Sequence, residues 1–137
     1  MKPPILLAFL GLATAQAAEP TGTLTLACQG TYTTVTVDAD LTQTGGKATP
    51  VSMDIIVDFT ARTVHGFGEP VPIIDVSEEE VSVFFADDAG AYKKTVTGRI
   101  YRVTGDVKVI SEWWNLKTYS SIETEYSLQC KPTQRMF

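Results

Sequence analysis

Apolar and polar residues alternate along most of the chain, and this pattern is typical of β-strands that bury one face. The clearest stretch is 51–59, where every second residue is apolar. Turn residues separate the segments, as at 43–47 and 87–90. The other predicted strands cover residues 23–28, 33–41, 63–67, 73–76, 81–85, 92–103, 107–114 and 122–130. Beyond the N-terminal apolar run, the pattern allows one helical turn at 77–80 and no helix.

Many short strands at this spacing predict an all-β domain. Both cysteines, Cys28 and Cys130, follow an apolar residue placed two positions earlier on the same strand face. A disulfide needs Cα atoms within about 4.4–6.8 Å, which adjacent strands satisfy. We therefore predict that a Cys28–Cys130 bond joins the first and last strands. That contact would close a small antiparallel up-and-down barrel of about eight strands, with a two-sheet β-sandwich as the alternative.

The first residues carry the pattern of a secretory signal peptide. Lys2 precedes an apolar run at 5–13, and Ala15 and Ala17 fit the small-x-small cleavage pattern. The run is shorter than the roughly 20 residues that a membrane-spanning helix needs. We predict a signal peptide at 1–17, a single β-domain at 18–137, no membrane span, and a periplasmic or secreted location. An oxidising compartment also favours the disulfide over a catalytic cysteine pair, which usually has the spacing C-x-x-C.

Charge and composition exclude several functions. Without Lys2, ten basic and sixteen acidic residues leave a net charge of −6. An acidic domain repels nucleic acid, so we expect no nucleic-acid partner. The chain has a single histidine, His65, and both of its cysteines are predicted to form the disulfide, so few metal ligands remain. We therefore predict no metal site and no cofactor. No nucleophile motif is present, so we predict no catalytic residue; a hydrolase that uses His65 with Asp54 and Asp58 is the less favoured alternative.

Three residues are candidates for ligand binding. Arg102 alternates with Ile100, so it points inward at a barrel mouth, either as an anion clamp or in a structural salt bridge. Trp113 and Trp114 are adjacent and must face opposite sides of a strand. Trp113 continues an apolar set and is predicted to be core, whereas Trp114 lies on the outer face or at the rim, exposed or covered by 115–121.

Three segments resemble a group of small exported bacterial proteins of unknown function. They are GRIYRVTG at 98–105, DFTARTV at 58–64, and YSLQCKP at 126–132 with the closing RMF at 135–137. The resemblance covers most of the mature chain and implies an exported module without an assigned activity. The predicted barrel is also similar to lipocalin-type proteins, although the chain lacks their G-x-W motif and the long helix after the last strand.

These observations together predict an exported, non-enzymatic β-barrel domain that binds a small apolar ligand or a protein partner. The alternative is a periplasmic or secreted module, inhibitor-like or interacting with an envelope protein, that acts through a projecting loop. The proline-rich segment 68–72 is the candidate for that loop.

Overall fold

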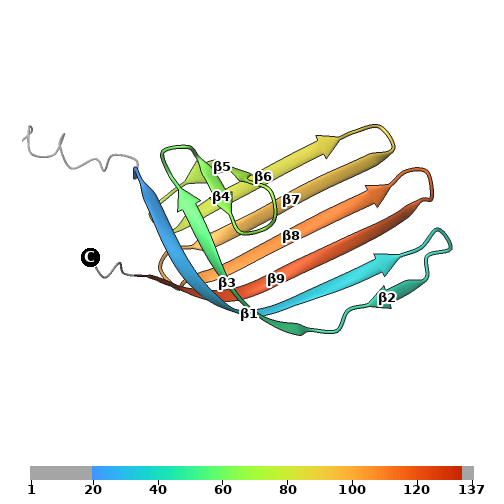
Figure 1. Ribbon diagram of the computed structural model, residues 1–137, viewed down its shortest axis with the longest axis horizontal. Coiled ribbons are helices and arrows are strands. Elements are labelled where there is room, and N and C mark those ends of the chain that lie inside the picture. The colour runs from blue at the N-terminus through green and yellow to red at the C-terminus, as the bar shows by residue number, and fades with distance from the viewer. Residues whose placement is uncertain (1–19, 134–137) are drawn as a thin grey trace, which may run out of the picture.

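The computed structural model describes residues 20–133, which form one antiparallel sheet of nine strands (Figure 1). The described residues contain no helix long and apolar enough to cross a bilayer. The predicted signal peptide lies outside the described residues. The strands are β1 (Thr23–Val37), β2 (Gln43–Gly45), β3 (Thr49–Asp58), β4 (Thr63–His65), β5 (Val71–Val76), β6 (Glu80–Asp88), β7 (Tyr92–Tyr101), β8 (Asp106–Asn115) and β9 (Ser120–Pro132).

Eight of the strands close into an up-and-down barrel, as the sequence predicts. Each strand from β3 to β9 pairs with the next, and β1 pairs with both β3 and β9. Strand β2 is an addition that pairs only with the last residues of β1. The closed order satisfies the backbone groups of the first and last strands, which would otherwise be sheet edges.

The predicted disulfide is present and joins β1 to β9. Cys28 stands directly opposite Cys130 in the strand register, and their Cα atoms are 4.0 Å apart. The two strands also approach closely at Gly30, where a Cβ atom would lie 2.0 Å from the backbone oxygen of Ser127. A side chain at that position would push the strands apart, so the residue must be glycine for the barrel to close as tightly as it does.

The core fills the closed part of the barrel with apolar side chains from every strand except β2. Its members expose 6% or less of their surface, and several are fully enclosed. An eight-stranded barrel is narrow enough for its own side chains to occupy the interior. The buried set is Leu26, Cys28, Ile55, Val57, Val64, Val71, Ile73, Val81, Val83, Val96, Ile100, Val107, Val109, Leu128 and Cys130.

The barrel is closed at one end and open at the other because its strands differ greatly in length. β4 has three residues and β5 six, whereas β1 has fifteen. Residues 84–88 of β6 therefore pair with β7 and have no partner on β5. Beyond the closed part, β6, β7, β8, β9, β1 and β2 continue as a curved sheet (Figure 1).

The largest difference from the predicted strands is in β1. Residues 23–28 and 33–41 were expected to be separate strands, but β1 runs from Thr23 to Val37 without a break. The alternation continues through Gly30 without a break. Thr34 and Thr36 therefore face the concave side of the sheet, and Val35 and Val37 face outward. Leu41, expected in the second strand, lies in the β1–β2 turn, where it has a φ of 68° and is 80% exposed.

Candidate functional site

A loop between β4 and β5, residues 66–70, lies across the barrel and divides its closed part from its open part. Phe67 packs edge-on against Tyr126 of β9, with ring centroids 5.1 Å apart. Glu69 forms an ion pair with Lys94 of β7. Segment 68–72, predicted to project as a binding loop, is thus held by contacts within the domain, and Val71 is fully buried.

Beyond this loop, the concave face of the curved sheet forms a surface that we call the trough. Its residues continue the alternation that fills the core, but no further strand covers them. In the closed part that alternation places only core side chains inside. The trough residues are Phe85 and Asp87 of β6, Tyr92 and Lys94 of β7, Ser111 and Trp113 of β8, Ile122 and Thr124 of β9, Thr34 and Thr36 of β1, and Thr44 of β2.

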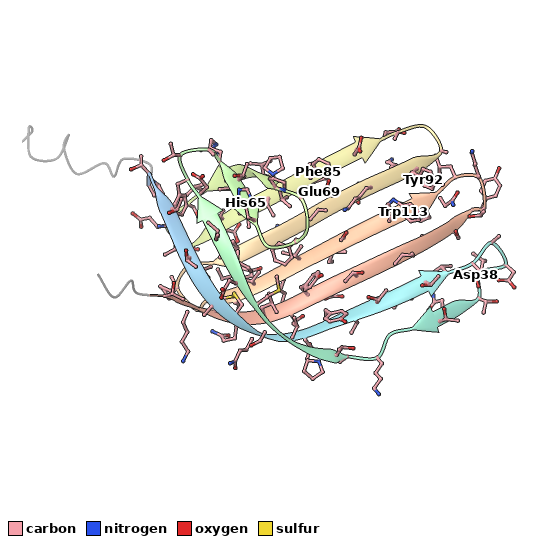
Figure 2. The ribbon with its side chains drawn as sticks, in the orientation of Figure 1. Asp38, His65, Glu69, Phe85, Tyr92 and Trp113 are labelled. Carbon is pink, nitrogen blue, oxygen red and sulfur yellow. A yellow bond between two sulfur atoms is a disulfide. The ribbon has the colours of Figure 1, made fainter. Side chains whose placement is uncertain are left out.

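Two aromatic rings dominate one side of the trough. Tyr92 and Trp113 stack with ring centroids 4.9 Å apart and an interplanar angle of 16°. They remain 41% and 37% exposed, and neighbouring Ile122 is also 37% exposed. Figure 2 shows Tyr92 and Trp113 close together, farther along the sheet than Glu69. Stacking fixes both rings, so the trough presents a rigid apolar surface to solvent.

The other side of the trough carries hydroxyl groups. Ser111 lies beside Thr124 in the register, and Thr124 lies beside Thr34. The hydroxyls of Thr34 and Thr124 are 3.3 Å apart and hydrogen-bond each other. Thr36 and Thr44 stand opposite each other in the register of β1 and β2. A ligand in the trough would therefore touch aromatic rings on one side and hydroxyls on the other.

The three residues predicted to bind ligand lie in three different places. Trp113 faces the trough, whereas Trp114 is on the opposite face of β8 and donates a hydrogen bond to Glu112, 3.2 Å away. Arg102 follows β7 at the closed end of the barrel, far along the strands from Trp113. Trp113 shares the face of Val107 and Val109 as expected, but it is not core, because the barrel has opened before β8 reaches it.

Tyr92, the ring partner of Trp113, is not among the residues predicted from the sequence to bind ligand. The sequence feature that could have predicted the position of Tyr92 is the β7–β8 turn. This turn places Ile100 opposite Val107, and that pairing sets every pair farther along the hairpin. Counting residues from that turn places Lys94 opposite Trp113. Tyr92 is two residues farther along β7 and therefore lies on the same face as Lys94.

At the closed end, Arg102 covers a small apolar cavity. Its guanidinium donates a 2.6 Å hydrogen bond to the backbone oxygen of Ser77 and lies 5.9 Å from the centre of the Phe59 ring. The cavity measures about 210 Å³ and is lined mainly by Leu24, Leu26, Val57, Phe59, Val81 and Ile100. Arg102 thus ties the β5–β6 and β7–β8 turns together across the base of the barrel.

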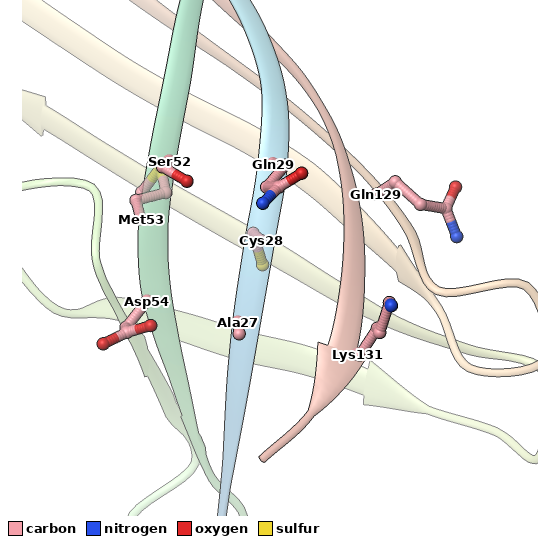
Figure 3. A pocket seen from close by; sticks show the side chains of 8 residues that line it. All are labelled: Ala27, Cys28, Gln29, Ser52, Met53, Asp54, Gln129 and Lys131. Atoms are coloured by element: carbon pink, nitrogen blue, oxygen red, sulfur yellow. The ribbon is translucent and has the colours of Figure 1, made fainter.

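A shallow groove runs over the outer face where β3, β1 and β9 lie side by side. It measures about 460 Å³, and Figure 3 shows Asp54, Gln29, Gln129 and Lys131 projecting from these strands. Gln129 already donates a 2.6 Å hydrogen bond to the backbone oxygen of Thr104. The groove is open to solvent, so a ligand lying in it would bury only part of its surface.

The remaining chemistry-bearing residues lie apart from the trough. Val64 is buried inside β4, so His65 points outward, and its ring nitrogen is 3.1 Å from the Thr63 hydroxyl. Asp54 and Asp58 also lie on the outer alternation of β3, and Asp58 accepts a hydrogen bond from the Ala61 amide. Within residues 20–133, no three His, Cys, Asp or Glu side chains gather as a metal site.

The trough is thus the surface on which large apolar side chains and hydroxyl groups converge. No family model, curated protein or solved structure matches the chain, and its function is inferred from the chemistry of these surfaces.

Proposed function

We propose that this chain is an exported, non-enzymatic binding domain whose ligand lies in the trough. The observation that carries the proposal is the stacked Tyr92–Trp113 pair, which is exposed on the face that elsewhere forms the core. Large aromatic side chains that remain exposed together often mark a surface that contacts a ligand. Rings held in place in this way supply a large contact area at a low cost in conformational entropy.

The cavity beneath Arg102 is the weaker candidate for a ligand site. Its volume of about 210 Å³ is smaller than the roughly 300–1,000 Å³ typical of small-molecule sites. Core side chains line it, and the guanidinium of Arg102 is already engaged by Ser77. The trough has no such limit on size. Its concave shape also favours a ligand that enters it over a flat protein surface.

We further propose that the protein works in the periplasm or outside a bacterial cell. The predicted signal peptide and the disulfide, a bond that persists in oxidising compartments, support this location. Mass spectrometry of the protein recovered from the periplasm or the medium tests it. We expect a mature chain that begins at residue 18; an intact N-terminus on a cytoplasmic protein would contradict the proposal.

A matched pair of tryptophan variants tests the trough. Trp113 and Trp114 are neighbours with similar exposure, 37% and 43%, but they lie on opposite faces of β8. The probe is N-phenyl-1-naphthylamine, a neutral aromatic molecule whose fluorescence rises when it leaves water. We expect Trp113→Ala to abolish the rise and Trp114→Ala to keep it. An equal signal from both variants and the wild type would refute binding in the trough.

A further inference from the structure

We infer that the ligand of the trough is an uncharged saccharide chain, an inference that rests on the proposed function and names its ligand class. The charges in the trough favour an uncharged ligand. Among the strand residues that face the trough, Lys94 is the only base, and Glu69 already neutralises it. Asp87 lies directly opposite Lys94 on β6. Phosphates, nucleotides and fatty-acid carboxylates would therefore find no free cation and would meet a carboxylate.

An aromatic surface remains exposed where Tyr92 and Trp113 stack on each other. One side of a pyranose ring carries mainly C–H groups, which pack well on an aromatic face, while its hydroxyls point outward around the ring. The two rings hold each other at 4.9 Å, so little side-chain freedom is lost when a ligand packs on them. Ile122, next to Trp113 in the register, extends this apolar surface.

The hydroxyl side of the trough matches the hydrogen-bonding groups of a sugar. Each serine or threonine hydroxyl both donates and accepts, as each sugar hydroxyl does. Ser111, Thr124 and Thr34 form one row across three strands, and Thr36 and Thr44 continue the row that begins at Trp113 and Ile122. A lipid chain in the same place would offer no hydrogen bond to the hydroxyls of Ser111, Thr36 and Thr44, whereas Thr34 and Thr124 already bond each other.

The trough also has the length for a chain of sugars. From the aromatic pair to its far side it spans the strands β7, β8, β9, β1 and β2. At roughly 4.8 Å per strand spacing, the four spacings give about 19 Å, which accommodates several linked rings. The aromatic pair lies near one end of this span and the hydroxyl pair of Thr36 and Thr44 near the other. An extended oligosaccharide that crosses the strands would meet both.

A glycan array with neutral and anionic oligosaccharides tests the inference, followed by titration of the bound sugars in solution, with cellohexaose and chitohexaose included. We expect neutral sugars to bind more tightly than their anionic counterparts. Trp113→Ala should lower the affinity at least about tenfold, and Trp114→Ala should leave it unchanged. Thermal unfolding of each variant shows whether it is folded.

A second pair of variants isolates the hydroxyl contribution at nearly constant shape. Thr124→Val removes one trough hydroxyl, and Thr97→Val removes one from the outer face of β7. We expect about a tenfold loss of sugar affinity for Thr124→Val and none for Thr97→Val. Sugar binding that survives both Trp113→Ala and Thr124→Val would overturn the inference.

The saccharide assignment and the proposed function fail in different ways. If no sugar on the array binds, but N-phenyl-1-naphthylamine still binds in a way that needs Trp113, the assignment to saccharides is wrong and the trough remains a binding site. A phospholipid vesicle or a peptide that competes with the probe would then show the true ligand class. If neither sugar nor probe depends on Trp113, both proposals fall.

Discussion

Reduction of the Cys28–Cys130 disulfide should lower stability greatly without changing the fold. The bond joins residues 102 positions apart, so it encloses nearly all of the described chain. With that loop length, the chain-entropy relation gives about 4.7 kcal/mol of stabilisation at 25 °C. For a domain of this size, such a loss lowers the midpoint of thermal unfolding by on the order of 20 °C.

The fold itself should survive because the bond is one contact in a long strand pair. The register between β1 and β9 extends from Leu26 opposite Pro132 to Val37 opposite Ser121. Its backbone hydrogen bonds do not depend on the sulfur atoms. We therefore expect the far-ultraviolet circular dichroism of the reduced protein to match that of the oxidised protein at low temperature.

The assay is urea unfolding of wild-type protein that was reduced while unfolded and then refolded with the reductant present. Reduced wild type keeps both sulfur atoms in the core, so the comparison measures the cross-link and not a cavity. The double variant Cys28→Ala/Cys130→Ala is the control, and its stability must be the same with and without reductant. A difference below about 1 kcal/mol between oxidised and reduced wild type would refute the entropic reasoning.

The remaining predictions concern backbone conformation, core packing and the loop that crosses the barrel. Gly105→Ala should lower the free energy of unfolding by about 1–3 kcal/mol, because a side chain at a φ of 81° is strained. A second cost adds to this loss, because the new Cβ would lie 2.3 Å from a backbone oxygen of β9. Gly90→Ala, with a φ of 78° and open space around it, should show only the first cost in urea unfolding. Ile55→Ala should cost about 2–5 kcal/mol because the side chain is fully buried, whereas Ile74→Ala, at a residue 60% exposed, should cost under about 0.5 kcal/mol; equal losses would contradict the placement of the core. Glu69→Gln should change stability by at most about 1 kcal/mol, since its ion pair is partly exposed, yet hydrogen exchange at 66–70 should accelerate; unchanged exchange would show that the ion pair does not hold the loop.

The sequence predicted most of the fold because the closed barrel depends on local patterns. The alternation at 51–59 and the matching positions of the two cysteines are enough to indicate strands that pair at the chain ends. Both features survive in the structure because burial of one strand face fixes which residues point inward. The turn at Gly105 likewise ends β7 and begins β8 where the pattern indicates.

The open end could not be predicted, because it depends on how far each strand outlasts its neighbours. Val35 and Val37 alternate with polar residues as core residues do, yet β1 continues through Gly30 and places them on the outer face. Trp113 follows the core alternation, and nothing in its own segment shows that β5 is too short to cover it. Its exposure follows from the lengths of strands far away in the sequence.

The position of the chain ends has a consequence for how the domain can be attached to something else. The first residues of β1 and the last residues of β9 both lie at the closed end, where the Thr133 amide bonds the Thr25 oxygen at 2.9 Å (Figure 1). The trough is at the opposite end, between the β6–β7, β8–β9 and β1–β2 turns. A tether, a fusion partner or a solid support joined at either end would therefore hold the domain with its trough directed away from the attachment.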